Sequence, residues 1–158
     1  MLKAIIIDDE QKGRMALRQK IADYCPDLEV IAEAASGQEG LDAIRRLEPQ
    51  LVFLDIEMPG MDGFEMLREI ENKNFHLIFT TAYDQYALKA FRFAAFDYLL
   101  KPVDIEELRK AVFRLLQQVQ TQTQQKIDAL EENLRAGTML TKIAVPSTNG
   151  LFFAWRNY

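Results

Sequence analysis

The fold is decided by the stretch Leu51-Val-Phe-Leu-Asp55-Ile-Glu57-Met-Pro59-Gly60-Met-Asp62-Gly63. Its first four residues are all apolar, which predicts a strand buried on both faces. The apolar run ends at the carboxylate of Asp55, and the proline and glycines that follow mark a tight loop. An aspartate at the carboxyl end of a buried strand lies where open α/β sheets bind their ligands. Asp55 alone could simply begin a turn, so the segments around it must decide.

Length and composition restrict the class of protein. The chain has 158 residues, 49% of them hydrophobic and 27% charged, which predicts one soluble domain with a sizeable core and a modest appendage. The net charge of -5 argues against a broadly basic nucleic-acid surface. Because no apolar run approaches the roughly 18 residues of a membrane span, we expect no membrane association. The single cysteine, Cys25, excludes an internal disulfide and favours a cytoplasmic location.

Apolar segments and segments with helical periodicity alternate along the chain. The expected strands are 4–7, 28–34, 51–54, 75–80 and 96–100. The expected helices are 11–24, one that begins after Ser36, 64–71, 82–93, and one that begins after Val103. This alternation predicts an α/β fold with a doubly wound, five-stranded parallel sheet and helices on both faces. Right-handed crossovers favour the strand order 2-1-3-4-5.

Chemically active side chains follow four of these strands. They are Asp8 and Asp9 after the first strand, Asp55 after the third, Thr81 after the fourth and Lys101 after the fifth. In a parallel sheet these positions meet at one edge, and three carboxylates there need a cation to stay ionised. Hard oxygen ligands with open coordination positions suit Mg²⁺. A metal and a lysine beside an aspartate are suited to phosphoryl transfer onto the carboxylate.

From Met1 to about Gln120 the chain resembles the receiver domain of two-component response regulators, the CheY-like family with a flavodoxin-like fold. The resemblance rests on Asp8-Asp9 after three isoleucines, Leu54-Asp55-Ile56-Glu57-Met58-Pro59-Gly60 with Gly63, Thr81-Ala82, and Tyr98-Leu-Leu-Lys101-Pro102. Any one of these motifs would be weak evidence, but together and in this order they are specific.

The resemblance implies a phosphorylation and metal site. Asp55 would be the phosphoacceptor and would receive its phosphoryl group from the phosphohistidine of a sensor histidine kinase. Asp9, Asp55 and the backbone carbonyl of Glu57 would bind Mg²⁺, and Asp8 would act through a metal-bound water. The protein would then be a signalling switch rather than an enzyme. Glu57 and Tyr83 would flank the path of water to Asp55, so we expect them to set the lifetime of the phosphoryl group.

The resemblance also implies a switch beside this site. Lys101 would pair with Asp55 and then with the phosphoryl group, across a cis peptide bond to Pro102. Thr81 would be the switch hydroxyl, and Tyr98 would turn inward behind it. The surface formed by 84–93, 96–100 and 104–119 would change, and its aromatic and basic residues predict a phosphorylation-dependent homodimer.

The remainder of the chain predicts an appendage. We expect the receiver domain at 1–120, a Gln-rich linker or helix extension at 121–137, and at 138–158 the start of a truncated output domain. Residues 142–153 read as a hairpin similar to the opening of the LytTR-type DNA-binding domain. The basic loops that read DNA in that domain would lie beyond Tyr158, so DNA binding would need an output domain that is missing here.

Two alternative functions remain open at this stage. The first is a Mg²⁺-dependent phosphatase with an aspartyl nucleophile, because such an enzyme carries a second acid two residues after the nucleophile, where Glu57 stands. The second is a degenerate receiver that acts only through protein contacts. Turnover of a generic phosphate ester would separate the phosphatase from the switch.

Overall fold

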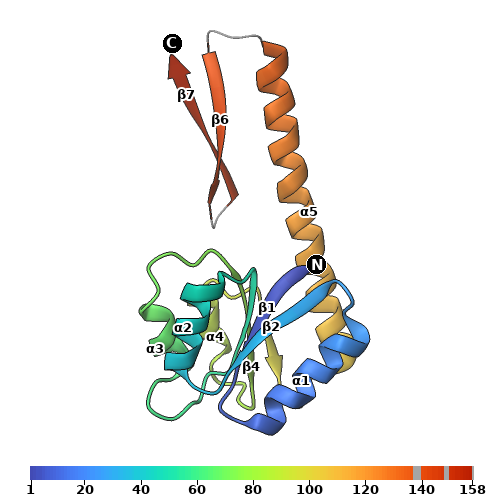
Figure 1. Ribbon diagram of the computed structural model, residues 1–158, viewed down its shortest axis with the longest axis vertical. Coiled ribbons are helices and arrows are strands. Elements are labelled where there is room, and N and C mark those ends of the chain that lie inside the picture. Colours follow the sequence, from blue (N-terminus) through green and yellow to red (C-terminus); the bar gives the residue numbers. More distant parts are fainter. Residues whose placement is uncertain (137–139, 148–149, 158) are drawn as a thin grey trace. The chain divides into compact units, whose positions relative to one another are not determined.

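The central feature of the fold is a five-stranded parallel sheet. The computed structural model describes residues 1–136, 140–147 and 150–157 (Figure 1). The strands are β1 (Leu2–Ile7), β2 (Leu28–Ala34), β3 (Leu51–Leu54), β4 (His76–Thr81) and β5 (Asp97–Leu100). Their order is β2-β1-β3-β4-β5, with every neighbouring pair parallel. The predicted strand order is therefore confirmed.

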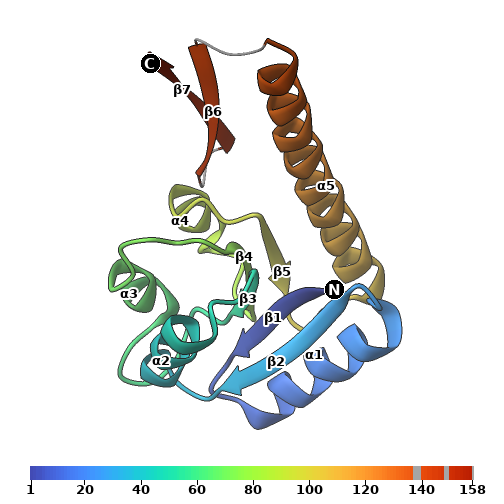
Figure 2. The same ribbon diagram turned by 45° about the horizontal axis from the view of Figure 1, so that its top comes forward.

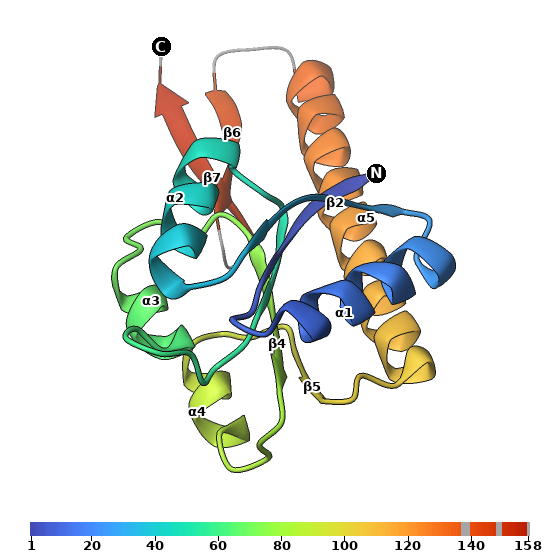
Figure 3. The same ribbon diagram turned by 60° about the horizontal axis from the view of Figure 1, so that its bottom comes forward.

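Helices cover both faces of this sheet. They are α1 (Gln11–Tyr24), α2 (Gly37–Leu47), α3 (Gly63–Arg68), α4 (Ala87–Arg92) and α5 (Ile105–Ala136). Helices α2, α3 and α4 lie on one side of the sheet, and α1 and the beginning of α5 lie on the other (Figures 2 and 3). This arrangement is the doubly wound architecture expected from the alternating pattern. None of the described helices is both long enough and apolar enough to cross a membrane.

The core explains why β3 is apolar throughout. All four of its side chains are fully buried, because both faces of this central strand are covered. On one face, Val52 and Leu54 belong to a cluster with apolar residues of α2 and α3, such as Leu41 and Met66. Leu17 of α1 is likewise buried. The chain therefore holds Asp55 at the end of the most deeply buried strand.

Two helices are shorter than the sequence predicts. Helix α3 ends at Arg68 because the N–H groups of Glu69 and Ile70 donate to carbonyls only three residues back, which tightens the last turn. Helix α4 begins at Ala87 rather than at residue 82. Upstream of it, the Thr81 hydroxyl accepts a hydrogen bond from the Tyr83 N–H at 3.3 Å, which favours a turn over a helix. Residues 82–86 therefore form a loop beside the carboxyl edge of the sheet.

Helix α5 continues through the Gln-rich segment without a break. The hydroxyls of Thr121 and Thr123 donate to carbonyls four residues earlier, each at 3.0 Å, so these side chains are accommodated along the helix. The chain divides into two compact units, Met1–Val112 and Phe113–Tyr158, and the division falls within this helix. In the second unit, β6 (Leu140–Ser147) and β7 (Gly150–Asn157) pair antiparallel, as the predicted hairpin requires. Its turn at 148–149 and the predicted helix end at Gly137 lie outside the described residues.

We predict that Gly63→Ala destabilises the protein more than Gly37→Ala. Both glycines occupy the first position of a helix. A Cβ atom at residue 63 would lie 2.5 Å from the backbone carbonyl oxygen of Asp55, whereas at residue 37 the nearest atoms belong to the flexible Met61 side chain, at 3.0 Å. We expect Gly63→Ala to cost about 1–3 kcal/mol, as overpacking typically does, and Gly37→Ala clearly less. Urea unfolding measures both, and equal midpoints would contradict the prediction.

Candidate functional site

The backbone places three site residues directly at the carboxyl edge of the sheet. Asp8 follows β1, Asp55 follows the buried β3, and Lys101 follows β5. Each still donates its backbone N–H to a neighbouring strand, so the sheet ladder extends one residue beyond the strand ends. The acceptors are the carbonyls of Ala34, Ile7 and Thr81, at 3.0, 2.9 and 2.7 Å respectively. The positions of these side chains are therefore fixed by sheet geometry rather than by flexible loops.

The side chains form one acidic cluster bridged by a lysine. Asp8, Asp9 and Asp55 each offer a carboxylate oxygen, and these oxygens lie within 4.8 Å of one another. The Lys101 ammonium donates to Asp8 Oδ2 at 2.6 Å and to Asp55 Oδ2 at 3.1 Å. Asp8 and Asp55 are almost fully buried, with 2% and 5% exposure. The structure thus brings together the four charged residues that the sequence assigns to this edge.

This cluster fits a divalent cation. Three carboxylates face one ammonium, so an excess of negative charge remains in a largely buried site. Within the described part of the chain, Asp9 Oδ1 is buried and has no hydrogen-bond partner. Buried oxygens without a partner are rare, and an ion is one way to satisfy them. Oxygen donors alone at this spacing suit Mg²⁺.

The electrostatics of the cluster oppose full ionisation. The pKa of Asp55 is raised from its ordinary value of 3.8 to about 6, mainly by burial and also by the Asp8 charge, and Lys101 partly offsets both effects. Burial by itself would lower the pKa of Lys101. Its hydrogen bond to Asp8 and the charges of both aspartates outweigh that effect, so the pKa of Lys101 is raised. The lysine therefore stays charged while Asp55 is ionised only at an energetic cost.

Helix α1 contributes two residues that the sequence analysis did not identify. A Cβ atom at Gly13 would lie 2.7 Å from Asp8 Oδ2, so the glycine leaves space for that carboxylate. Arg14 donates from Nη1 to the Asp8 backbone carbonyl at 2.7 Å and so helps to hold this residue in place. A glycine within a predicted helix was an available signal for a close approach. No sequence pattern indicated the contact of Arg14.

The predicted switch residues lie around the loop at 82–86. Thr81 is fully buried at the end of β4. Tyr98 is half-buried on β5, where its ring lies 6.3 Å from that of Phe79, and its phenol donates to the backbone carbonyl of Tyr83. The Lys101–Pro102 peptide bond is cis. Both Thr81 and Tyr98 therefore contact the Tyr83 backbone.

The Glu57 carboxylate is exposed and accepts a hydrogen bond of 2.7 Å from the Tyr86 phenol. That hydrogen bond raises the pKa of Tyr86, and the Glu57 charge raises the pKa of Tyr83. The side chain of Glu57 thus interacts with two phenols of the neighbouring loop. The sequence analysis expected Glu57 and Tyr83 in this region but did not identify Tyr86.

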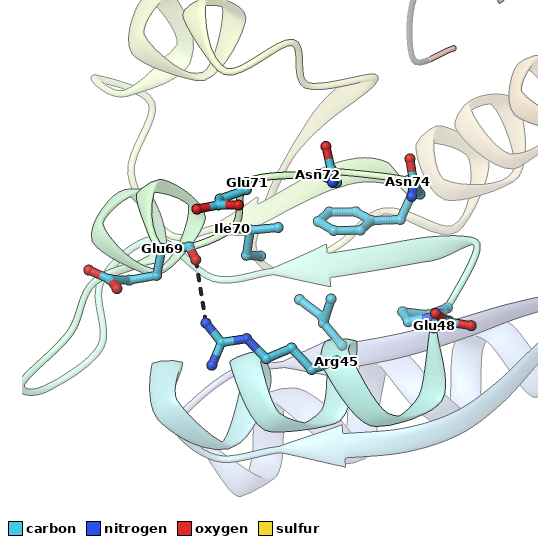
Figure 4. Close-up of a pocket in the computed structure, with 10 residues that line it drawn as sticks. Arg45, Glu48, Glu69, Ile70, Glu71, Asn72 and Asn74 are labelled. Carbon is cyan, nitrogen blue, oxygen red and sulfur yellow. Dashed lines mark hydrogen bonds between the residues drawn. The ribbon is translucent and has the colours of Figure 1, made fainter. Parts of the chain in front are cut away.

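Two hollows lie at opposite edges of the sheet. One, of about 390 Å³, adjoins the acidic cluster between α1 and the segment after β5, where Asp8, Gly13, Lys101 and Pro102 line it. The other, of about 730 Å³, lies where β3 and β4 begin, and Arg45 reaches across it to the Glu69 carbonyl at 3.4 Å (Figure 4). Because the acidic cluster follows the strand ends, the larger cavity is not part of this site.

A parallel sheet with this order and an aspartate–lysine cluster at its carboxyl edge defines a class of phosphoryl-receiving signalling domains. Residues 4–113 match the family described as the response regulator receiver domain, so the chain belongs to that family. Receiver domains of this family bind Mg²⁺ at an acidic pocket, which the aspartate cluster here resembles. The family assignment confirms the resemblance drawn from the sequence.

The relatives are response regulators and transcriptional regulators. An uncharacterized response regulatory protein of Vibrio cholerae is 50% identical over 119 residues, covering 75% of this chain and 50% of that protein. The transcriptional regulatory protein BtsR of Escherichia coli is 39% identical over 137 residues, covering 86% of this chain and 56% of BtsR. The chain thus spans about half the length of these curated relatives.

Solved receiver structures share the fold. The REC domain of AraT, a response regulator from Geobacillus stearothermophilus, has a TM-score of 0.69 and 34% identity, covering 77% of this chain and 98% of that domain. A DNA-binding response regulator of the LuxR family from Staphylococcus aureus has a TM-score of 0.65 and 35% identity, covering 72% of this chain and 98% of that structure.

We predict that Asp55→Asn stabilises the metal-free protein at neutral pH. Both folded and unfolded chains hold the Asp55 proton below about pH 3, so the wild type and the variant should then be equally stable. As the pH rises through 3.8 toward about 6, the unfolded chain releases this proton first, which lowers the free energy of unfolding of the wild type. Above pH 6 the difference should be on the order of 2–3 kcal/mol, equivalent to roughly two pKa units.

Urea unfolding in EDTA at pH 3 and pH 7.5 measures this difference. Asp42→Asn, which removes an exposed carboxylate of α2, is the matched control and should show no comparable gain. Equal stability of Asp55→Asn and the wild type at pH 7.5 would show that the cluster carries no such cost.

Proposed function

We propose that Asp55 is the phosphoacceptor of this receiver domain and that its phosphorylation by a sensor histidine kinase requires Mg²⁺. The proposal depends on one observation: a nearly buried aspartate lies at the sheet edge beside two further aspartates, with Lys101 in contact at 3.1 Å. This donor set has the charge and chemistry for binding a cation and a phosphoryl group together.

The proposed reaction is a direct transfer between two side chains. An Asp55 carboxylate oxygen attacks phosphorus, a P–O bond forms, the P–N bond of the kinase phosphohistidine breaks, and its electron pair returns to the imidazole. Lys101 orients Asp55 and remains charged for the incoming phosphoryl oxygens. Asp8, Asp9, Asp55 and the Glu57 backbone carbonyl would hold Mg²⁺. When bound, the ion screens the repulsion between the carboxylate and the phosphoryl oxygens.

The proposed switch acts through Thr81 and Lys101. A phosphoryl group adds almost two negative charges at Asp55. The Thr81 hydroxyl, which accepts the Tyr83 N–H in this structure, would instead donate to the phosphoryl group, and Lys101 would follow the new charge. Only one arrangement of the loop at 82–86 satisfies both contacts, so phosphorylation shifts the population toward it. Tyr98, bonded to the Tyr83 carbonyl, would move with that loop.

The output that we propose is control of transcription, as the names of the full-length relatives indicate. Relatives named as transcriptional regulators support it, although this chain covers about half of their length. We propose 1–120 as the receiver, 121–137 as the helical extension, and 138–158 as the beginning of a LytTR-type output domain. The second unit contains the antiparallel hairpin of β6 and β7 that this proposal requires, and the LytTR type itself rests on the sequence resemblance alone. DNA contact would belong to that output domain rather than to the receiver.

Our first functional prediction is a mass gain of one phosphoryl group. The protein, incubated with acetyl phosphate and Mg²⁺ and weighed intact, should gain this mass, whereas Asp55→Asn should not. EDTA should abolish the gain, because the cluster would lack its cation. Asp9→Asn should raise the Mg²⁺ concentration required for phosphorylation at least tenfold, because it removes a proposed ligand of the ion.

The controls separate this proposal from its alternatives. Asp42→Asn should be phosphorylated like the wild type. A gain that persists in Asp55→Asn would place the chemistry on another residue, and no gain in the wild type would favour a receiver that acts only through protein contacts. Multiple turnover of p-nitrophenyl phosphate, dependent on Asp55, would favour the aspartyl phosphatase instead.

We further predict that phosphorylation causes homodimerisation through the surface of α4, β5 and the beginning of α5. Leu88 and Phe91 of α4 are 84% and 80% exposed, and their i, i+3 spacing makes them neighbours on the helix surface, as in an apolar patch that binds another protein. Sedimentation velocity with acetyl phosphate and Mg²⁺ should show a dimer for the wild type. Phe91→Ser should remain monomeric, and Met15→Ser, at an exposed position of α1, should dimerise normally. An unchanged profile of the phosphorylated wild type would refute dimerisation.

A further inference from the structure

One hydrogen bond joins two loops that flank the proposed phosphorylation site. Glu57 lies two residues after Asp55, in the segment between β3 and α3, and Tyr86 lies immediately before α4. The Tyr86 phenol donates to Glu57 Oε1 at 2.7 Å, which is a good length for a bond to a charged acceptor. The bond therefore links the loop that follows the phosphoacceptor to the loop that follows the switch threonine.

The position of Tyr86 does not depend on its hydroxyl. Its ring lies edge-on against the fully buried ring of Phe64, with centroids 6.0 Å apart, and against Tyr83 at 6.2 Å. Its backbone carbonyl accepts the Ala90 N–H at 2.8 Å, which ties it to the first turn of α4. Glu57, in contrast, is exposed. The phenol is thus the anchored partner and the carboxylate is the partner that it restrains.

An unrestrained Glu57 carboxylate could act as a base. Hydrolysis of an aspartyl phosphate requires a water oxygen to attack phosphorus, the P–O bond to Asp55 to break with its electron pair returning to the carboxylate, and the water to release a proton. A carboxylate two residues from Asp55 can accept that proton. In this structure Glu57 Oε1 accepts a hydrogen bond from the Tyr86 hydroxyl, so this oxygen is directed at the beginning of α4 rather than at a water.

We propose that Tyr86 is a positioning residue that prolongs the phosphorylated state by holding the Glu57 carboxylate away from the attacking water. The proposal rests on the proposed function of Asp55. It assigns to Tyr86 the control of signal duration, through Glu57 rather than through contact with the phosphoryl group.

The test is a double-mutant cycle on phosphoryl lifetime. Wild type, Tyr86→Phe, Glu57→Ala and the double variant are phosphorylated with acetyl phosphate and Mg²⁺, freed of donor, and followed by intact mass. Tyr86→Phe retains the ring and removes only the hydroxyl. This variant should lose its phosphoryl group about three- to tenfold faster than the wild type. The expected increase is smaller than the rate effect of a fully positioned general base. In the Glu57→Ala background the same change should have no effect. Tyr24→Phe, at an exposed phenol at the end of α1, should decay like the wild type.

A second measurement does not depend on phosphorylation. Hydrogen exchange of the metal-free protein should be faster in residues 57–60 and 83–87 of Tyr86→Phe than of the wild type, because the bond between the loops is lost. Unchanged exchange together with unchanged lifetime would overturn the proposal. So would acceleration by Tyr86→Phe that persists without Glu57, since that would be a general structural effect. Absence of phosphorylation in the wild type would instead refute the function of Asp55, while the exchange data would still test the bond.

Discussion

The structure depends on an imbalance of charge that the fold does not allow to relax. Two carboxylates within 4.8 Å of one another repel by at least about 3 kcal/mol at an effective dielectric constant of about 20. Lys101 compensates part of this repulsion through Asp8 and Asp55. Asp8 and Asp55 cannot move apart, because sheet hydrogen bonds fix their backbones. The remaining charge therefore favours binding of a cation over rearrangement of the protein.

The same rigidity explains why the sequence predicts so much of the site. In a parallel sheet with buried strands, the first residue after each strand is fixed at one edge once the strand order is known. Asp8, Asp55 and Lys101 occupy such positions. Identifying the three apolar runs was therefore enough to predict that their side chains lie close together. The order itself follows from the alternation of strands and helices and from the handedness of crossovers. No information on long-range contacts was needed.

The features that the sequence did not predict depend on individual side-chain contacts. The sequence predicts a helix over 82–93, but the hydrogen bond from the Tyr83 N–H to the Thr81 hydroxyl favours a turn at its beginning. Arg14 and Tyr86 lie on the expected elements, yet their partners are a backbone carbonyl and a carboxylate on other segments. Periodicity reports which face of a helix is buried, and it carries no information about such pairs.

These contacts also determine where a change at Asp55 can be transmitted. Residues 82–85 are exposed, so their rearrangement would expose little apolar surface, whereas β3 and β4 are almost fully buried. Regions with few buried contacts open at low free energy, and buried strands do not. The loop at 82–86 also forms hydrogen bonds with Thr81, Tyr98 and Glu57, which are the residues that a phosphoryl group on Asp55 would affect. The loop and α4, rather than the sheet, should therefore move when the charge at Asp55 changes.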